Sequence, residues 1–184
     1  RAAAAFMAAL PDQWAGRAFR EVVARTVRAQ RAGRPVVLLA GGHVVKVGVS
    51  PCFIELLERG VVAHVAMNGA TAIHDIEIAL TGRTSEDVDA EIDSGRFGMA
   101  EETGRMLNDA ITRGAKEGWG LGEAVGHYIN RYQGQFPHRK ISLLATGARL
   151  GVPVTVHVAL GTDIIHMHPS ADGASIGAAS LLDF

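Results

Sequence analysis

The sequence has little cysteine, no excess of either charge and no long apolar run. Its 184 residues include one cysteine, so an internal disulfide is excluded and a reducing, cytoplasmic location is favoured over a disulfide-stapled secreted scaffold. The 18 basic and 19 acidic residues leave a formal net charge of -1 and give no electrostatic case for a nucleic-acid or anionic-membrane partner. No stretch approaches the roughly 18 uncharged apolar residues of a membrane span.

What is present is enough apolar material for a core. Hydrophobic residues make up 48% of the chain, which argues against intrinsic disorder and fits one globular domain with an appendage. The single Cys52 lies in the apolar run 52–54, and this context predicts a buried, inert thiol.

The N-terminal part of the sequence predicts two helices. Residues 1–10 are mostly alanine, and residues 19–32 place Phe19, Val22, Val23 and Val27 at helical spacing with arginines on the other face. Gly33 ends the second helix. We therefore expect an N-terminal helical segment over 1–33 and a separate domain over 34–184.

The second part alternates strand and helix patterns. Buried strands are predicted over 36–40, 61–67 and 152–158, with one more over 163–167. The intervening helices are predicted over 53–59, from Asn68 to Gly82, and over 101–115, 121–132 and 141–150, with Ser50 as the N-cap before Pro51. The alternation predicts an α/β fold, a Rossmann-like parallel sheet with helices on both faces, in which 36–40 is a central strand buried on both sides.

Three predicted strands run directly into glycine or small polar residues. These turns are 41–42, 68–70 and 161–163, and ligands of parallel sheets bind at the carboxyl ends of the strands. Glycine there lets the backbone approach a ligand, and a following helix N-terminus offers amide donors to phosphate. A nucleotide site is predicted, although neither the G-x-G-x-x-G fingerprint nor a Walker A motif occurs.

Three polar residues beside these turns are the candidate catalytic residues. His74 and Asp75 follow the turn at Asn68 within the start of a helix, so both are expected to face a bound cofactor or substrate; the alternative is a locally packed histidine. Asp163 is expected to orient a substrate amine, and its alternative is a turn aspartate. His43 and Lys46 follow the first strand and are candidates for binding an anionic group.

The pair His166 and His168 supports a second hypothesis. Alternate residues of a strand point to one face, so the two imidazoles could hold one metal ion in a metal-dependent hydrolase. A tetrahedral site needs more ligands than these two, and the leading hypothesis includes no metal.

Three segments carry a resemblance to a known family. Residues 39–50, 67–75 and 161–169 make the chain resemble the deoxyhypusine synthase family, in particular its bacterial relatives. The resemblance runs from about Arg34 to Asp183. It implies a Rossmann-like NAD-binding fold, a homotetramer with sites between subunits, and transfer of an aminobutyl group from spermidine through an imine. The cofactor-binding residues assigned on the strand ends and the resembling segments are Gly41, Gly42, Ser50, Asn68, Gly69, Ala70, Gly161 and Thr162.

The sequence also departs from that family. Its catalytic lysine stands in a Trp-Gly-Lys segment that nothing here matches, and Gly151 stands where the family has a histidine that contacts the polyamine. The leading hypothesis is therefore an NAD-binding protein that acts on a small amine or polyamine-type substrate, forms a homo-oligomer, and binds neither nucleic acid nor membrane. A third hypothesis is a non-catalytic oligomeric relative that keeps the fold.

Overall fold

A computed structural model describes residues 2–85, 92–95 and 100–184. The chain divides into two compact units, Arg1–Val36 and Val37–Phe184. Among the described residues, no helix is both long and apolar enough to cross a membrane.

The first unit consists of two helices, as predicted. They are α1 (Ala2–Ala9) and α2 (Trp14–Arg31), and Gly33 follows α2 in the left-handed conformation that ends helices. Asp12 lies between the helices and accepts a hydrogen bond from Arg20, with 2.9 Å between Oδ1 and Nη2. The side chains of Phe19, Val22 and Val23 are exposed.

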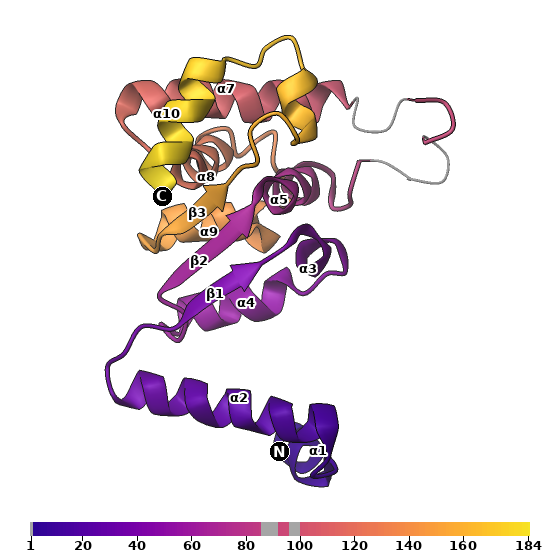
Figure 1. The fold of residues 1–184 in the computed structure, drawn as a ribbon, viewed down its shortest axis with the longest axis vertical. Helices are drawn as coiled ribbons and strands as arrows, with labels where there is room; N and C mark the ends of the chain where they lie inside the picture. The colour runs from indigo at the N-terminus through magenta and orange to yellow at the C-terminus, as the bar shows by residue number, and fades with distance from the viewer. Residues whose placement is uncertain (1, 86–91, 96–99) are drawn as a thin grey trace. The chain divides into compact units, whose positions relative to one another are not determined.

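The second unit is an α/β fold built on a three-stranded parallel sheet (Figure 1). The strands pair in the order β1 (Val37–Ala40), β2 (His64–Asn68) and β3 (Val154–His157). Its helices, with the two 3-10 helices η1 and η2, are α3 (Gly42–Lys46), α4 (Ser50–Glu58), α5 (Gly69–Thr81), α7 (Glu101–Glu117), α8 (Leu121–Arg131), η1 (Arg139–Ile141), α9 (Leu143–Leu150), η2 (Ile164–Met167) and α10 (Gly173–Asp183).

Burial alternates along the strands, so the two faces of the sheet differ. Val65, Met67, Val154 and Val156 are at most 5% exposed and point into the core, whereas Leu39 on the other face is 77% exposed. Because the strand order follows the chain order, right-handed crossovers place every connection on the same side of the sheet. The structure therefore differs from the prediction of helices on both faces.

Strand β1 is correctly predicted as a strand but wrongly predicted as a central one. It lies at the edge of the sheet, and Val37 and Leu39 are exposed. The same short apolar run occurs in central strands and in edge strands that have one uncovered face. The sequence therefore did not distinguish a central strand from an edge strand.

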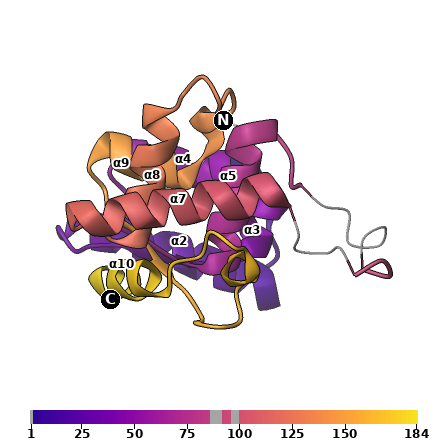
Figure 2. The ribbon, with the colours of Figure 1, turned by 90° about the horizontal axis from the view of Figure 1, so that it is seen from above.

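The core lies between the sheet and helices α5, α7, α8 and α9. Gly147 of α9 lies against the side chain of Val154, and Gly122 of α8 lies against the backbone oxygen of Val154. Seen from above, α7 runs between α8 and α10 and contacts both (Figure 2). The largest fully buried side chains include Ile76, Leu107, Ile111, Leu121, Ile129, Phe136, Leu143 and Leu144.

Two local predictions about α4 are wrong. The helix begins at Ser50, and its N-cap is Val49, so Ser50 does not cap it; Pro51 occupies the first turn as predicted. Cys52 is exposed. Ser50, Ile54 and Leu57 recur at helical spacing and form the buried side of α4, and Cys52 falls outside that stripe.

Candidate functional site

The carboxyl ends of the three strands meet at one edge of the sheet. Ala40 pairs with Met67, and Asn68 pairs with His157, so the strands end nearly level. The three turns expected to bind a ligand therefore emerge on the same side.

The start of α5 is fixed between the ends of β1 and β2. Asn68 caps α5, because its Oδ1 accepts from Thr71 N at 3.0 Å and from Thr71 Oγ1 at 2.7 Å. Thr71 Oγ1 also lies 3.2 Å from the backbone oxygen of Ala40, which ends β1. Among the predicted binding residues, Asn68 thus has a capping role, and Ala70 is exposed beside it.

Two glycines let separate segments approach this point. A Cβ at Gly42 would lie 3.2 Å from His74 Cδ2 and 3.3 Å from Ala70 C, and a Cβ at Gly69 would overlap the carboxylate of Asp163. The structure therefore brings together Gly42, Gly69, Ala70, His74 and Asp163, which come from three predicted motifs.

The remaining predicted binding residues are Gly41, Ser50, Gly161 and Thr162. Gly41 is exposed, Gly161 adopts a left-handed φ of 81°, and Thr162 Oγ1 donates to the backbone oxygen of Ala159 at 3.0 Å. Ser50 Oγ is buried at the start of α4 and has no hydrogen-bond partner in the described part of the chain.

The turn after β3 contains two buried polar atoms without hydrogen-bond partners among the described residues: Asp163 Oδ2 and His166 Nε2. His166 N donates to Asp163 O at 3.0 Å, and residues three apart in a 3-10 turn project from the same side. Gly161 N donates to His166 Nδ1 at 3.3 Å, which assigns the ring proton of a neutral imidazole to Nε2. One turn therefore holds an acceptor and a donor without partners among the described residues, and the acceptor, the Asp163 carboxylate, lies against Gly69.

His74 is held by a buried glutamate. Its Nδ1 lies 3.1 Å from Oε2 of Glu77, which is 5% exposed, and Glu77 Oε1 accepts from Ser85 Oγ and Thr103 Oγ1. Burial acts to raise the pKa of Glu77, but the hydrogen bonds from His74 and Ser85 outweigh it and lower that pKa. Glu77 is thus an ionised partner that orients His74. Sequence reasoning missed it, although the i,i+3 spacing from His74 was a usable signal.

Asp75 is directed at the start of α9. It is fully buried, and its carboxylate accepts from Ser142 Oγ at 2.5 Å, Leu143 N at 2.8 Å and Leu144 N at 3.1 Å. Burial raises its pKa to about 6, against the opposing effect of these hydrogen bonds. Neighbouring residues on a helix project about 100° apart, so His74 and Asp75 do not share a direction. Asp75 joins α5 to the N-terminus of α9.

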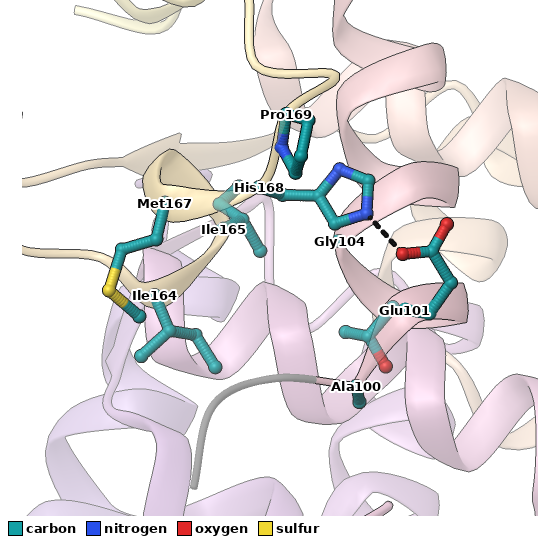
Figure 3. A pocket seen from close by; sticks show the side chains of 9 residues that line it. Ala100, Glu101, Gly104, Ile164, Ile165, Met167, His168 and Pro169 are labelled. Carbon is teal, nitrogen blue, oxygen red and sulfur yellow. Dashed lines mark hydrogen bonds and ion pairs between the residues drawn. The ribbon is translucent and has the colours of Figure 1, made fainter. Parts of the chain in front are cut away.

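A small pocket lies between the start of α7 and η2 (Figure 3). Its volume is about 140 Å³, and Ile164, Ile165 and Met167 contribute apolar walls. Thr103 lines it and donates to Glu77, so the pocket adjoins the His74–Glu77 pair.

His168 and Glu101 form the polar wall of this pocket. Ser170 N donates to His168 Nδ1 at 3.1 Å, which places the proton of the neutral ring on Nε2; Nε2 then donates to Glu101 Oε2 at 2.8 Å. Figure 3 shows the imidazole directed at this carboxylate. The sequence alone did not indicate this contact, because it joins residues 67 positions apart.

The structural basis of the metal hypothesis is wrong. Residues 164–167 form a 3-10 helix and not a strand, so His166 and His168 do not alternate along one strand face. Within residues 2–85, 92–95 and 100–184, no group of three or more His, Cys, Asp or Glu side chains is arranged to hold a metal ion.

Comparison with known proteins adds no assignment: no family model matches the chain, and no curated protein matches its sequence.

Proposed function

We propose that the protein is a Rossmann-like, deoxyhypusine-synthase-like protein that binds NAD at the carboxyl edge of its sheet and uses it to oxidise, or to transfer a group from, an amine or polyamine-type substrate. The observation that carries the proposal is a pair of buried polar atoms, Asp163 Oδ2 and His166 Nε2, that have no hydrogen-bond partner among the described residues. The Asp163 carboxylate lies against Gly69 at the start of α5. Buried polar atoms of this kind call for a partner, which a ligand can supply.

The residues present fit such a cofactor. A nicotinamide carboxamide has one donor and one acceptor, as the unpaired pair requires, and a ribose hydroxyl also donates and accepts. The Asp163 carboxylate would repel a phosphate at Gly69, so the diphosphate would lie toward the exposed His43 and Lys46 of α3.

The chemistry that NAD supplies when bound is the acceptance of a hydride, here from the carbon that carries the amine. His74 is the residue placed to accept the amine proton. Its Nδ1 faces Glu77, which leaves Nε2 for the substrate. The pocket between α7 and η2 adjoins this pair and would hold the apolar part of the substrate.

The test is calorimetric titration of the purified chain with NAD. We expect saturable binding, weakened about tenfold or more by Asp163→Asn, which places an NH2 group or a weaker acceptor opposite the cofactor donor. Asp109→Asn is the matched control, because Asp109 lies on α7 in a long, partly exposed contact of 3.9 Å with Arg105, and its affinity for NAD should equal that of the unchanged chain.

Absence of saturable binding at millimolar NAD would refute the proposal. A second measurement tests the reaction by following NADH absorbance after amines are added. The absorbance should rise with the unchanged chain, and the rate of this rise should be much lower with His74→Gln, although the variant binds NAD with unchanged affinity. NAD binding without reduction by any amine would instead favour the non-catalytic relative.

A further inference from the structure

A second pocket lies among the helices of the second unit and shares no residue with the proposed cofactor site. It is lined by residues of α4, α8, η1 and α9, and α9 contacts both α4 and α8 (Figure 2). Its volume is about 300 Å³, at the lower end of the roughly 300–1,000 Å³ of small-molecule sites. Its charged and polar lining residues, all in the second unit, are Glu58, Asn130, Arg139, Lys140, Thr146 and Arg149.

This basic pocket stands out because the unit that contains it is acidic. Residues 37–184 contain eleven basic and seventeen acidic residues, for a net charge of -6. Three of those basic residues, Arg139, Lys140 and Arg149, line the pocket with the single carboxylate of Glu58, so the net charge of its lining is +2. An excess of cations in a cavity favours an anionic ligand, and a doubly charged anion balances this excess.

Two of the three cations are positioned by contacts with neighbouring side chains. Arg149 Nη2 donates to Glu58 Oε1 at 2.6 Å, and Arg139 Nη2 donates to Gln133 Oε1 at 2.9 Å. A guanidinium has five N–H donors, so each arginine keeps others for a ligand. The Lys140 ammonium forms no ion pair or side-chain hydrogen bond in the described part of the chain, which leaves all of its donors available.

Thr146 adds a buried hydroxyl to the lining. Its residue is 2% exposed, and Oγ1 has no hydrogen-bond partner among the described residues. Asn130 Nδ2 donates one hydrogen to Ala145 O at 2.8 Å and keeps a second one. Buried polar groups are normally hydrogen-bonded, so the Thr146 hydroxyl calls for a partner that a ligand in the pocket can supply.

We infer that the basic pocket binds a small molecule through a phosphate group. A phosphate monoester carries about 1.5–2 negative charges near pH 7 and has three strong acceptor oxygens. It therefore matches both the net charge of +2 and the surplus of donors in the lining. A carboxylate carries one charge on two oxygens and would leave part of that charge and some of those donors without a partner.

Calorimetric titration of the purified full chain with glycerol phosphate and with inorganic phosphate tests the inference. We expect saturable binding of both ligands at constant ionic strength, without NAD, so the result is independent of the proposed function. Lys140→Gln and Thr146→Val should each weaken binding about tenfold, because each removes a donor to a charged oxygen. Lys116→Gln, at an exposed lysine of α7 outside the pocket, should bind as the unchanged chain does.

Two further variants distinguish a formed site from general attraction of anions. Thr146→Ser keeps the hydroxyl and should restore the affinity that Thr146→Val loses. Glu58→Gln keeps an acceptor for Arg149 but removes the negative charge, so binding should tighten about two- to fivefold. A misfolded variant cannot produce that increase in affinity.

Four results would overturn the inference. They are heat that does not saturate, binding of inorganic phosphate but not of the ester, affinity unchanged by both Lys140→Gln and Thr146→Val, and weaker binding by Glu58→Gln.

Discussion

His74 and Asp75 are neighbours in sequence with different roles. His74 lies near the carboxyl ends of the strands and pairs with Glu77, whereas Asp75 accepts three hydrogen bonds from the N-cap and first turn of α9. The sequence placed both residues correctly at the start of a helix after a strand. It could not give their directions, because Ser142 and Leu143 lie more than 60 positions away along the chain.

Asp75 should give the stability of the fold a distinctive pH dependence. Its pKa is about 6 in the folded protein and 3.8 without the fold, so between these values the folded state holds a proton that the unfolded chain has released. The free energy of unfolding contributed by Asp75 therefore falls as the pH rises from about 4 to 6. Asp75→Asn removes this dependence and also loses acceptors for Ser142, Leu143 or Leu144, at a cost of about 1–3 kcal/mol near neutral pH.

Urea unfolding of both chains at several pH values measures this effect. The difference in unfolding free energy should grow as the pH falls from about 6 to 4. Asp172→Asn is the control, because the hydrogen bond from Ser175 lowers the pKa of Asp172 and places its titration below this window. A constant difference between the Asp75→Asn and unchanged chains would show that Asp75 does not titrate as stated.

Sequence reasoning missed Glu77 and Glu101, and it considered His166 only as a metal ligand. Each gains its role from a contact with another element, such as Thr103 on α7 for Glu77 or His168 after η2 for Glu101. The spacing of residues within one helix or strand does not predict contacts with another element. The turns after the strands could be predicted, because they consist of glycine and small polar residues.

At the level of the elements, glycine sets how closely helices approach the sheet. Gly122, in the first turn of α8, lies against the backbone oxygen of Val154, and its own N donates to Asp183 Oδ2 at 2.9 Å. Asp183 Oδ2 also accepts from Val156 N at 2.8 Å, so one carboxylate joins α8, β3 and α10. Little room exists there for any side chain.

We expect Gly122→Ala to destabilise the fold by about 1–3 kcal/mol, because its methyl group would force α8 away from β3. Gly177→Ala is the matched control in α10. No atom lies within 4 Å of its added Cβ, so the higher helix propensity of alanine should stabilise the fold by about 0.5–1 kcal/mol. Thermal unfolding measures both, and equal effects of the two substitutions would contradict this account of the α8–β3 contact.

Element prediction succeeded where the pattern was long or had clear boundaries. The helices α2, α5, α7, α8 and α9 and the three strands are confirmed, and Gly82 and Gly151 end their helices in the left-handed conformation as expected. The prediction of a strand over 163–167 is wrong, because residues 164–167 form a 3-10 helix. In a run of five residues, the periodicity of the apolar positions does not distinguish a strand from a 3-10 turn. Helices α3 and α10 were not predicted; α10 is rich in alanine and glycine and has little amphipathic pattern.

For the whole molecule, the alternation of strand and helix patterns in the sequence predicted the parallel α/β class. It did not predict that the helices of the second unit cover only one face of the sheet. Alternation alone leaves the strand order open, and the strand order decides which face each crossover covers. The net charge of -1 was equally uninformative, since it is the small remainder of two units with charges of +5 and -6.

The chain order of the strands also bears on how the molecule folds. Strands β1 and β2 are separated by a short connection that contains α3 and α4, whereas residues 69–153, with most of the helices, separate β2 from β3. Closing the longer connection costs more chain entropy and requires those helices to be in place. We therefore expect β1 and β2 to pair early and β3 to join last, so that the carboxyl edge of the sheet, which includes the turn after β3, is completed only at the end of folding.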